Sequence, residues 1–257
     1  MEFSNKLIAW YNQNKRDLPW RKTNNPYLIW ISEIILQQTR VDQGLPFYKK
    51  FIKKFPNIES LASSHEDHVL KVWQGLGYYS RARNMHFTAK EIVKNQNGVF
   101  PKEYNQLLKL KGIGEYTAAA IASFSYNHPY AVVDGNVVRV LSRVFGVKLT
   151  FDNTQGKKQF RRLAQNLIVV DNAGVYNQSI MEFGALQCKI KNPDCSICVI
   201  KTICFAYNNQ EVDALPIKSR KLKIKNRFLI FLMIKTEKGV LISKKLSGIW
   251  KGLYEFP

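Results

Sequence analysis

Residues 107–124 have the sequence LLKLKGIGEYTAAAIASF, and residues 132–139 have the sequence VVDGNVVR. In the first stretch, Gly112 and Gly114 flank one isoleucine, between an apolar approach and an alanine-rich segment with helical periodicity. This pattern predicts a tight helix-to-helix turn. Because the amides from Gly114 onward begin a helix, they can bind a phosphate, and two lysines add positive charge there: Lys109 and Lys111. The alternative is an ordinary helical hairpin that needs glycine only for a positive φ.

Asp134 directly precedes an apolar helical pattern at residues 135–144. Aspartate at such a position is commonly the N-cap of the helix, where one side-chain oxygen accepts a backbone N–H. Since the other carboxylate oxygen stays free in that arrangement, Asp134 can cap the helix and also take part in a reaction.

Residues 26–39, PYLIWISEIILQQT, are apolar on almost every side of a helix and predict a buried one. Glu33 is the exception, with Trp30 and Ile34 beside it on the same helical face. Burial makes an ionised carboxylate costly and raises its pKa, which suits a general acid. The alternative for a lone glutamate is a surface position or a partner arginine.

All four cysteines lie within seventeen residues, in the pattern Cys188-x6-Cys195-x2-Cys198-x5-Cys204. This placement is poor for a disulfide framework and suits a metal centre in a reducing compartment. Four thiolates with no histidine among them fit tetrahedral zinc or a cubane iron–sulfur cluster, and the residue types alone do not choose between the two.

The chain of 257 residues has room for one large or two ordinary domains, and its 39 basic and 19 acidic residues give a formal net charge of +20. This excess favours nucleic acid as a partner over a membrane surface, because no amphipathic anchor or lipidation motif accompanies it. The N-terminus has neither a basic nor an apolar signal region, so we expect a cytoplasmic protein. The longest apolar run, residues 228–234, has the length of a strand and is too short to span a membrane.

Together these stretches resemble the helix-hairpin-helix DNA glycosylases, and within them the adenine DNA glycosylases of the MutY type. The similarity covers essentially the whole chain and is dense at five places. These are the GIG turn with the VDGN after it, SEIILQQT at residues 32–39, RDLPWR at residues 16–21, GLGYY at residues 75–79, and the cysteine spacing.

The resemblance implies a mainly α protein of two helical lobes with a DNA cleft between them. Its parts would be a helical-barrel lobe with the hairpin at residues 18–124, an iron–sulfur cluster lobe from residues 1–17 and 125–207, a basic linker at 208–226, and the start of a Nudix-like β domain at 227–257. A sheet domain of that kind needs more chain than the roughly 40 residues present, so we expect it to be incomplete and the chain to be truncated there.

The implied reaction is base excision repair by a monofunctional glycosylase, which hydrolyses the bond to adenine mispaired with 8-oxoguanine or guanine. By family position, Glu33 would protonate the purine ring nitrogen and then assist the incoming nucleophile. Asp134 would stay ionised and stabilise the positive sugar. Tyr116 and Asn136 would orient these two groups. The partner would be double-stranded DNA carrying an adenine mispair, met in the bacterial nucleoid, and the protein would act as a monomer.

The resemblance also implies binding residues. The pocket for the target base would include Arg16, Leu18, Trp20 and Arg21, and Gln178 would face the adenine. Gln38 and Tyr78 would wedge into the base stack, and Thr39 would contact the strand that carries the lesion. The hairpin residues Lys109, Lys111, Gly112 and Gly114 would grip the DNA backbone. Cys188, Cys195, Cys198 and Cys204 would hold a 4Fe–4S cluster.

Plainer interpretations exist for two of these segments. The loop at residues 15–21 can be a proline-bounded linker with a packed tryptophan, and Gln178 can be an ordinary surface residue of a helix.

Two alternatives concern the function. One is an endonuclease III-like enzyme that also cuts the strand; in that branch a lysine stands in the place of Tyr116 and forms a Schiff base, which a phenol cannot do. The other is a non-catalytic, cluster-bearing DNA-binding protein, against which the presence of both Glu33 and Asp134 argues.

Periodicity predicts the remaining elements. We expect helices at about residues 3–14, 47–54, 64–73, 154–169 and 172–186, the third of them opening with a capping box from Ser64 to Asp67. Strands are expected at residues 228–234 and 240–243, with a turn at 237–239 between them.

Overall fold

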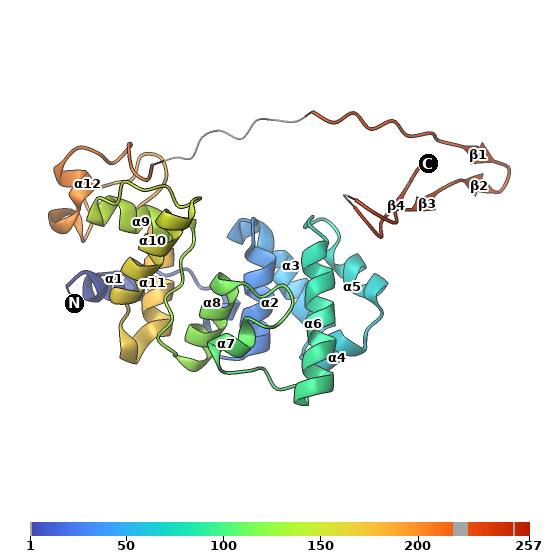
Figure 1. Ribbon diagram of the computed structural model, residues 1–257, viewed down its shortest axis with the longest axis horizontal. Coiled ribbons are helices and arrows are strands. Elements are labelled where there is room, and N and C mark those ends of the chain that lie inside the picture. The colour runs from blue at the N-terminus through green and yellow to red at the C-terminus, as the bar shows by residue number, and fades with distance from the viewer. Residues whose placement is uncertain (1, 218–225, 249) are drawn as a thin grey trace. The chain divides into compact units, whose positions relative to one another are not determined.

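The computed structural model describes residues 2–217, 226–248 and 250–257. The chain divides into two compact units, Met1–Ser219 and Arg220–Pro257, which we call the helical unit and the C-terminal unit. The mainly helical fold expected from the sequence is confirmed (Figure 1).

Twelve α-helices are formed by the described residues of the helical unit. They are α1 (Glu2–Asn14), α2 (Pro26–Leu36), α3 (Val41–Lys54), α4 (Ile58–Ser63), α5 (Glu66–Trp73), α6 (Ser80–Gln96), α7 (Tyr104–Leu107), α8 (Glu115–Tyr126), α9 (Gly135–Phe145), α10 (Thr154–Asn166), α11 (Ala173–Leu186) and α12 (Phe205–Asn208). Three short 3-10 turns accompany them: η1 (Pro19–Arg21), η2 (Val170–Asn172) and η3 (Lys201–Ile203). Among the described residues, no helix is both long enough and apolar enough to cross a membrane.

Some of the predicted helix limits are wrong. Helix α3 begins at Val41, α4 was not predicted, and α5 begins at Glu66, after the start expected at Ser64. The N-cap of α5 is His65, whose ring nitrogen accepts the Asp67 N–H, so the predicted capping box is absent from this described helix. A capping box closes the start of α4, where Asn57 and Ser60 exchange hydrogen bonds.

A first hydrophobic core surrounds α2, which lies between α3 and α8 (Figure 1). Because α2 is apolar on almost every side, its residues contact both neighbours, and Trp30, Ile31 and Ile35 are fully buried. The same core includes large side chains from α3 and α5, among them Phe51 and Trp73. These contacts fix α2 as a rigid support for the polar residues that it carries.

A second core joins α1, α9, α10 and α11 through side chains such as Leu7, Val140, Phe160 and Phe183. The buried Asn177 of α11 connects this core with α8 and the segment that follows it. Its side chain accepts the Val132 N–H at 3.1 Å and donates to Ser123 Oγ at 3.0 Å and to the Tyr130 carbonyl at 2.8 Å. Such a fully paired amide fixes the register between the two cores.

The predicted helix-to-helix turn lies between α7 and α8. Gly112 has a φ of 80°, and a Cβ atom there would lie 2.8 Å from Cβ of Asn84, so glycine is required by both conformation and space. The Thr88 hydroxyl donates to the Lys111 carbonyl at 2.7 Å and holds the turn against α6. Gly114 is the N-cap of α8, which leaves the first amides of that helix without side-chain caps.

The C-terminal unit contains short strands in its described residues: β1 (Lys235–Thr236), β2 (Gly239–Val240), β3 (Ser243–Lys244) and β4 (Tyr254–Glu255). The pairs β1–β2 and β3–β4 are antiparallel, with Lys235 opposite Val240 and Ser243 opposite Glu255. The turn expected at residues 237–239 is therefore present.

The strand predicted at residues 228–234 is wrong, because strand pairing begins at Lys235. Phe228 is 91% exposed, so among the described residues the apolar run covers no core that would hold it in a sheet. The strand expected at 240–243 is replaced by the ends of β2 and β3. Much of the expected basic linker, residues 218–225, lies outside the described residues. Residues 209–217 belong to the helical unit, where Arg143 donates to the Leu215 carbonyl at 3.0 Å.

Candidate active site

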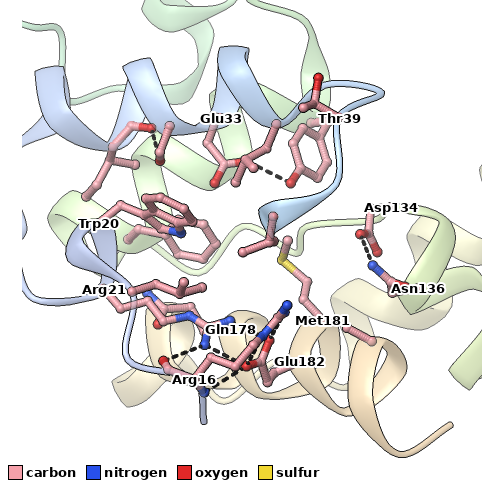
Figure 2. A pocket seen from close by; sticks show the side chains of 18 residues that line it. Arg16, Trp20, Arg21, Glu33, Thr39, Asp134, Asn136, Gln178, Met181 and Glu182 are labelled. Carbon is pink, nitrogen blue, oxygen red and sulfur yellow. Dashed lines mark hydrogen bonds and ion pairs between the residues drawn. The ribbon is translucent and has the colours of Figure 1, made fainter. Parts of the chain in front are cut away.

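A cavity of about 180 Å³ lies where the two hydrophobic cores of the helical unit meet. It is lined by α2, α11 and the loop that contains η1, together with the starts of α8 and α9 (Figure 2). Ten of the residues selected from the sequence line it: Arg16, Leu18, Trp20, Arg21, Glu33, Thr39, Tyr116, Asp134, Asn136 and Gln178. Residues from distant parts of the chain therefore converge on one cavity.

Glu33 projects from the middle of α2 and is 5% exposed, so it is not a surface glutamate. Its Oε2 atom accepts a hydrogen bond from the Tyr116 hydroxyl at 2.7 Å. The pKa of Glu33 is raised to about 7, mainly by burial and also by the negative charge of Asp134, while the Tyr116 hydrogen bond acts in the opposite direction. A carboxyl group with this pKa is about half protonated at neutral pH, so it can both donate and accept a proton.

Asp134 is the N-cap of α9, as its position in the sequence indicated. Oδ1 accepts the Val137 N–H at 2.8 Å, and Oδ2 accepts from the Asn136 side-chain amide at 2.8 Å. Burial raises the pKa of Asp134, while the hydrogen bonds from Val137 and Asn136 favour the ionised form. The carboxylate is thus fixed in orientation by donors on both oxygens, and the expectation that one oxygen stays free is wrong, because the Asn136 side chain reaches it.

Arg139 connects Asn136 with the loop that contains the cysteines. Its guanidinium donates to Asn136 Oδ1 at 2.9 Å and to the Cys188 carbonyl at 2.7 Å. A continuous chain of hydrogen bonds therefore runs from Asp134 to Cys188.

Glu182 of α11 lies at the opposite side of the cavity from Glu33 in Figure 2, and the sequence analysis did not select it. Its carboxylate accepts hydrogen bonds from Arg16, through Nε at 2.9 Å and Nη2 at 2.6 Å, and from Arg21, through Nη1 at 2.8 Å and Nη2 at 2.6 Å. Burial opposes its ionisation, but the hydrogen bonds from Arg21 and Arg16 outweigh burial and lower the pKa of Glu182 to about 2. The signal in the sequence was the same as for Glu33, a lone carboxylate in an apolar helix.

Gln178, one turn before Glu182 on α11, is held by a residue that the sequence analysis also missed. The buried Tyr11 hydroxyl donates to Gln178 Oε1 at 2.5 Å. This contact occupies the amide oxygen and leaves the amide nitrogen to donate to a ligand.

The other residues selected from the sequence lie outside this cavity. Gln38 and Tyr78 are exposed and share an unusual left-handed backbone, with φ values of 56° and 47°. The hairpin residues Lys109, Lys111, Gly112 and Gly114 are also exposed. They form a surface with uncapped amides and two cations, which is chemically suited to a phosphate.

The four cysteines line a separate cavity beside Arg143. All are free thiols, and Arg143 Nη1 lies 3.4 Å from the sulfur of Cys188. Burial raises the pKa of Cys198 to about 11. In the described part of the chain, no three His, Cys, Asp or Glu side chains are placed close enough together to share a metal ion. The donor set nonetheless fits a four-thiolate centre, because four soft ligands line one cavity.

The amino-acid sequence of this chain is similar to those of known DNA repair proteins. Residues 31–168 match the model of the HhH-GPD superfamily base excision DNA repair protein. The adenine DNA glycosylase of Buchnera aphidicola subsp. Acyrthosiphon pisum (strain APS) is 39% identical over 257 residues, covering 99% of this chain and 73% of that protein. The adenine DNA glycosylase of Arabidopsis thaliana is 35% identical over 292 residues, covering 98% of this chain and 46% of that protein.

Two solved structures have the same fold. A thermostable thymine-DNA glycosylase superposes with a TM-score of 0.74 at 29% identity, covering 80% of this chain and 95% of that one. Endonuclease III in a non-covalent DNA complex superposes with a TM-score of 0.68 at 19% identity, covering 80% of this chain and 94% of that one.

Proposed function

The chain belongs to the HhH-GPD superfamily of base excision DNA repair proteins, and on that premise we propose that it removes adenine opposite 8-oxoguanine or guanine by a monofunctional reaction. It is a DNA glycosylase, a hydrolase of N-glycosyl bonds. The observation that carries the proposal is the contact between Glu33 and Tyr116, which places a buried acid beside a phenol.

Glu33 supplies the proton in this proposal. With a pKa of about 7, about half of the Glu33 carboxyl groups are protonated at neutral pH, and the protonated form can donate to a ring nitrogen of a base held in the cavity. Protonation makes adenine a better leaving group. The same carboxylate, once ionised, can accept a proton from the incoming nucleophile.

Asp134 stabilises the sugar as positive charge develops on it. Donors on both of its oxygens favour the carboxylate form over the neutral acid. The two carboxyl groups thus have different environments and different roles, which is the usual division in reactions with an oxocarbenium-like transition state.

The far side of the cavity recognises the base. Gln178 offers an amide donor, which suits a ring nitrogen. Glu182 is ionised and holds the guanidinium groups of Arg16 and Arg21 in place at the same side of the cavity.

Outside the cavity, Gln38 and Tyr78 fill the space left when the base leaves the helix. Thr39, which lines the cavity, contacts the strand that carries the lesion. The hairpin amides bind backbone phosphate with the help of Lys109 and Lys111. The two cores correspond in this proposal to a helical-barrel lobe at residues 18–124 and a cluster lobe at 1–17 and 125–207. A linker and the start of a Nudix-like domain follow, and the protein acts in the cytoplasm as a monomer.

We also propose that Cys188, Cys195, Cys198 and Cys204 hold a 4Fe–4S cluster. The four thiolates would hold the cluster, and their bonds to iron would cross-link four points of the loop. Arg139 then fixes the Cys188 end of this loop against Asn136, which orients Asp134.

The test is a single-turnover assay on a duplex with adenine opposite 8-oxoguanine, with an adenine–thymine duplex as the control. We expect release of adenine from the mispair and an intact abasic strand, which is cut only after alkali. Borohydride should trap little covalent complex, because Tyr116 supplies no amine.

Efficient cutting without alkali, together with trapping, would support an endonuclease III-like reaction instead. Tight binding of the mispair without release of a base would support a non-catalytic DNA-binding protein.

A further inference from the structure

Arg81 lies in the first turn of α6, and its guanidinium donates to five backbone carbonyls. Nη1 lies 2.9 Å from the Ile34 oxygen, 3.1 Å from that of Ile35 and 2.6 Å from that of Gln37. Nη2 lies 3.3 Å from the oxygens of both Leu76 and Gly77. One side chain therefore contacts two segments that are some forty residues apart in the sequence.

The first set of carbonyls belongs to the C-terminal end of α2, which finishes at Leu36. The last carbonyls of a helix have no partners within it, and a cation at this end is favoured both by those oxygens and by the helix dipole. Arg81 thus terminates the same helix that carries Glu33.

The second set belongs to the turn between α5 and α6. The Gly77 carbonyl also accepts the Trp73 indole N–H at 3.0 Å, and the Arg81 guanidinium stacks on the Trp73 ring at 5.1 Å. Arg81 is therefore held on both sides by fixed groups. Its guanidinium is directed to carbonyls, which makes it unsuited to contact a DNA phosphate.

A residue with a strained backbone directly follows each of these contacts. Gln38 follows Gln37 with a φ of 56°, and Tyr78 follows Gly77 with a φ of 47°. Such conformations persist in residues other than glycine only where the surroundings hold them. Tyr78 is 67% exposed and Gln38 is also exposed, so neither is held by burial of its own side chain.

We propose that Arg81 is a positioning residue that joins the end of α2 and the turn at residues 75–78 into one unit. Gln38 and Tyr78 then enter the base stack together. Because Glu33 lies on the same helix as the end that Arg81 holds, insertion of the two side chains and placement of the acid are linked. This inference rests on the proposed function, in which Gln38 and Tyr78 occupy the space left by the extruded base.

Lysine cannot replace arginine in this role. The planar guanidinium presents two separate nitrogens, one to each segment, whereas an ammonium is a single point donor on a flexible chain. Arg81→Lys therefore keeps the charge but holds at most one of the two segments. Arg83→Lys, one residue further along α6 from Ala82, is the matched control for the same chemical change.

The experiment is a double-mutant cycle of Gln38→Ala and Tyr78→Ala, carried out in the wild type, in Arg81→Lys and in Arg83→Lys. Base extrusion is followed by the fluorescence of 2-aminopurine placed as the target base, and adenine release by single-turnover kinetics. Thermal unfolding of each variant shows whether it is folded.

In the wild type and in Arg83→Lys, we expect each alanine substitution to reduce extrusion about tenfold and the pair to reduce it by little more than one alone. In Arg81→Lys the effects of the two alanine substitutions should be independent, so that the double variant shows the product of the two separate reductions in extrusion. The inference would be overturned if the effects of Gln38→Ala and Tyr78→Ala on extrusion were independent in all three proteins. It would also be overturned if the two effects were coupled to the same extent in all three.

Failure of the proposed function gives a different result. If the wild type unstacks 2-aminopurine and shows the coupling but releases no adenine, the positioning role stands and the proposed reaction does not. If it releases adenine without coupling, the reaction stands and the role of Arg81 does not.

Discussion

The Tyr116 hydroxyl donates to Glu33 Oε2 across 2.7 Å, and this bond joins the start of α8 to the middle of α2. Burial and the nearby carboxylates raise the pKa of Tyr116 well above 10, so the phenol stays protonated and remains a donor. Its effect on Glu33 is to favour the ionised form against the dominant effect of burial. These opposing effects leave the pKa of Glu33 at about 7.

The pH dependence of adenine release should report this balance. Since the protonated form of Glu33 is the active one, the single-turnover rate should be maximal below pH 7 and fall about tenfold per pH unit above it. Tyr116→Phe removes a bond that lowers the pKa, so the inflection should move to higher pH. An unmoved inflection in that variant would show that the titrating group is not Glu33.

Glu33→Gln keeps the shape of the side chain and removes its transferable proton. We expect a loss of about a hundredfold or more in adenine release, while binding of the mispaired duplex is largely retained. Glu91→Gln, on α6 and outside the cavity, is the control and should leave both quantities unchanged. Normal turnover by Glu33→Gln would place the acid elsewhere.

Glu182 should make the protein sensitive to acid. Its folded pKa of about 2 lies below its ordinary 4.5, so its stabilisation is complete above pH 4.5 and is lost as the pH falls toward 2. The shift corresponds to about 3 kcal/mol in the free energy of unfolding. Urea unfolding between pH 7 and pH 3 should show about 2 kcal/mol of this loss in the wild type, since the rest is lost only at lower pH. The dependence should be much weaker in Glu182→Gln, which should also release adenine poorly.

Lys109→Ala should weaken DNA binding to the same extent for mispaired and for normally paired duplexes. Loss of one phosphate contact lowers the slope of log affinity against log salt concentration by about 0.9. Lys94→Ala is the control, because Lys94 lies near the C-terminal end of α6, away from Asn84 and the hairpin turn. Equal slopes for Lys109→Ala and the wild type would remove Lys109 from the DNA-binding surface.

The cysteine loop should contain iron. Anaerobically purified protein should be yellow-brown and carry about four irons per chain, and Cys198→Ser should lose most of this iron. If the wild type contained stoichiometric zinc and no iron, the cluster proposal would be wrong, and the four cysteines would form a structural zinc site instead.

The sequence was most informative where one residue type serves one local purpose. The glycines of the hairpin, the N-cap at Asp134 and the buried α2 all follow from conformational and apolar patterns within a few residues. Ten cavity residues were identified mainly because the chain resembles a known family, since periodicity does not show which distant segments meet.

Glu182, Tyr11 and Arg81 were missed because their roles depend on tertiary partners. Glu182 is explained by two arginines some 160 residues away in the sequence, and Arg81 by carbonyls, which every residue possesses. The error at residues 228–234 has a similar origin. An apolar run becomes a strand only when another strand pairs with it, and the run itself does not state whether one is available.

The presence of Glu33 and the presence of Asp134 do not indicate equally strongly that a chain of this family is catalytically active. Asp134 caps α9, and loss of an N-cap costs about 1 kcal/mol, which offsets part of the cost of burying its carboxylate. Glu33 makes the folded protein less stable. As pH rises from 4.5 to 7, its raised pKa decreases the free energy of unfolding by about 3 kcal/mol, and no hydrogen bond to a helix start compensates. A copy that had lost its activity would gain stability by replacing Glu33 with an apolar residue, so Glu33 distinguishes a working enzyme from an inactive descendant more sharply than Asp134 does.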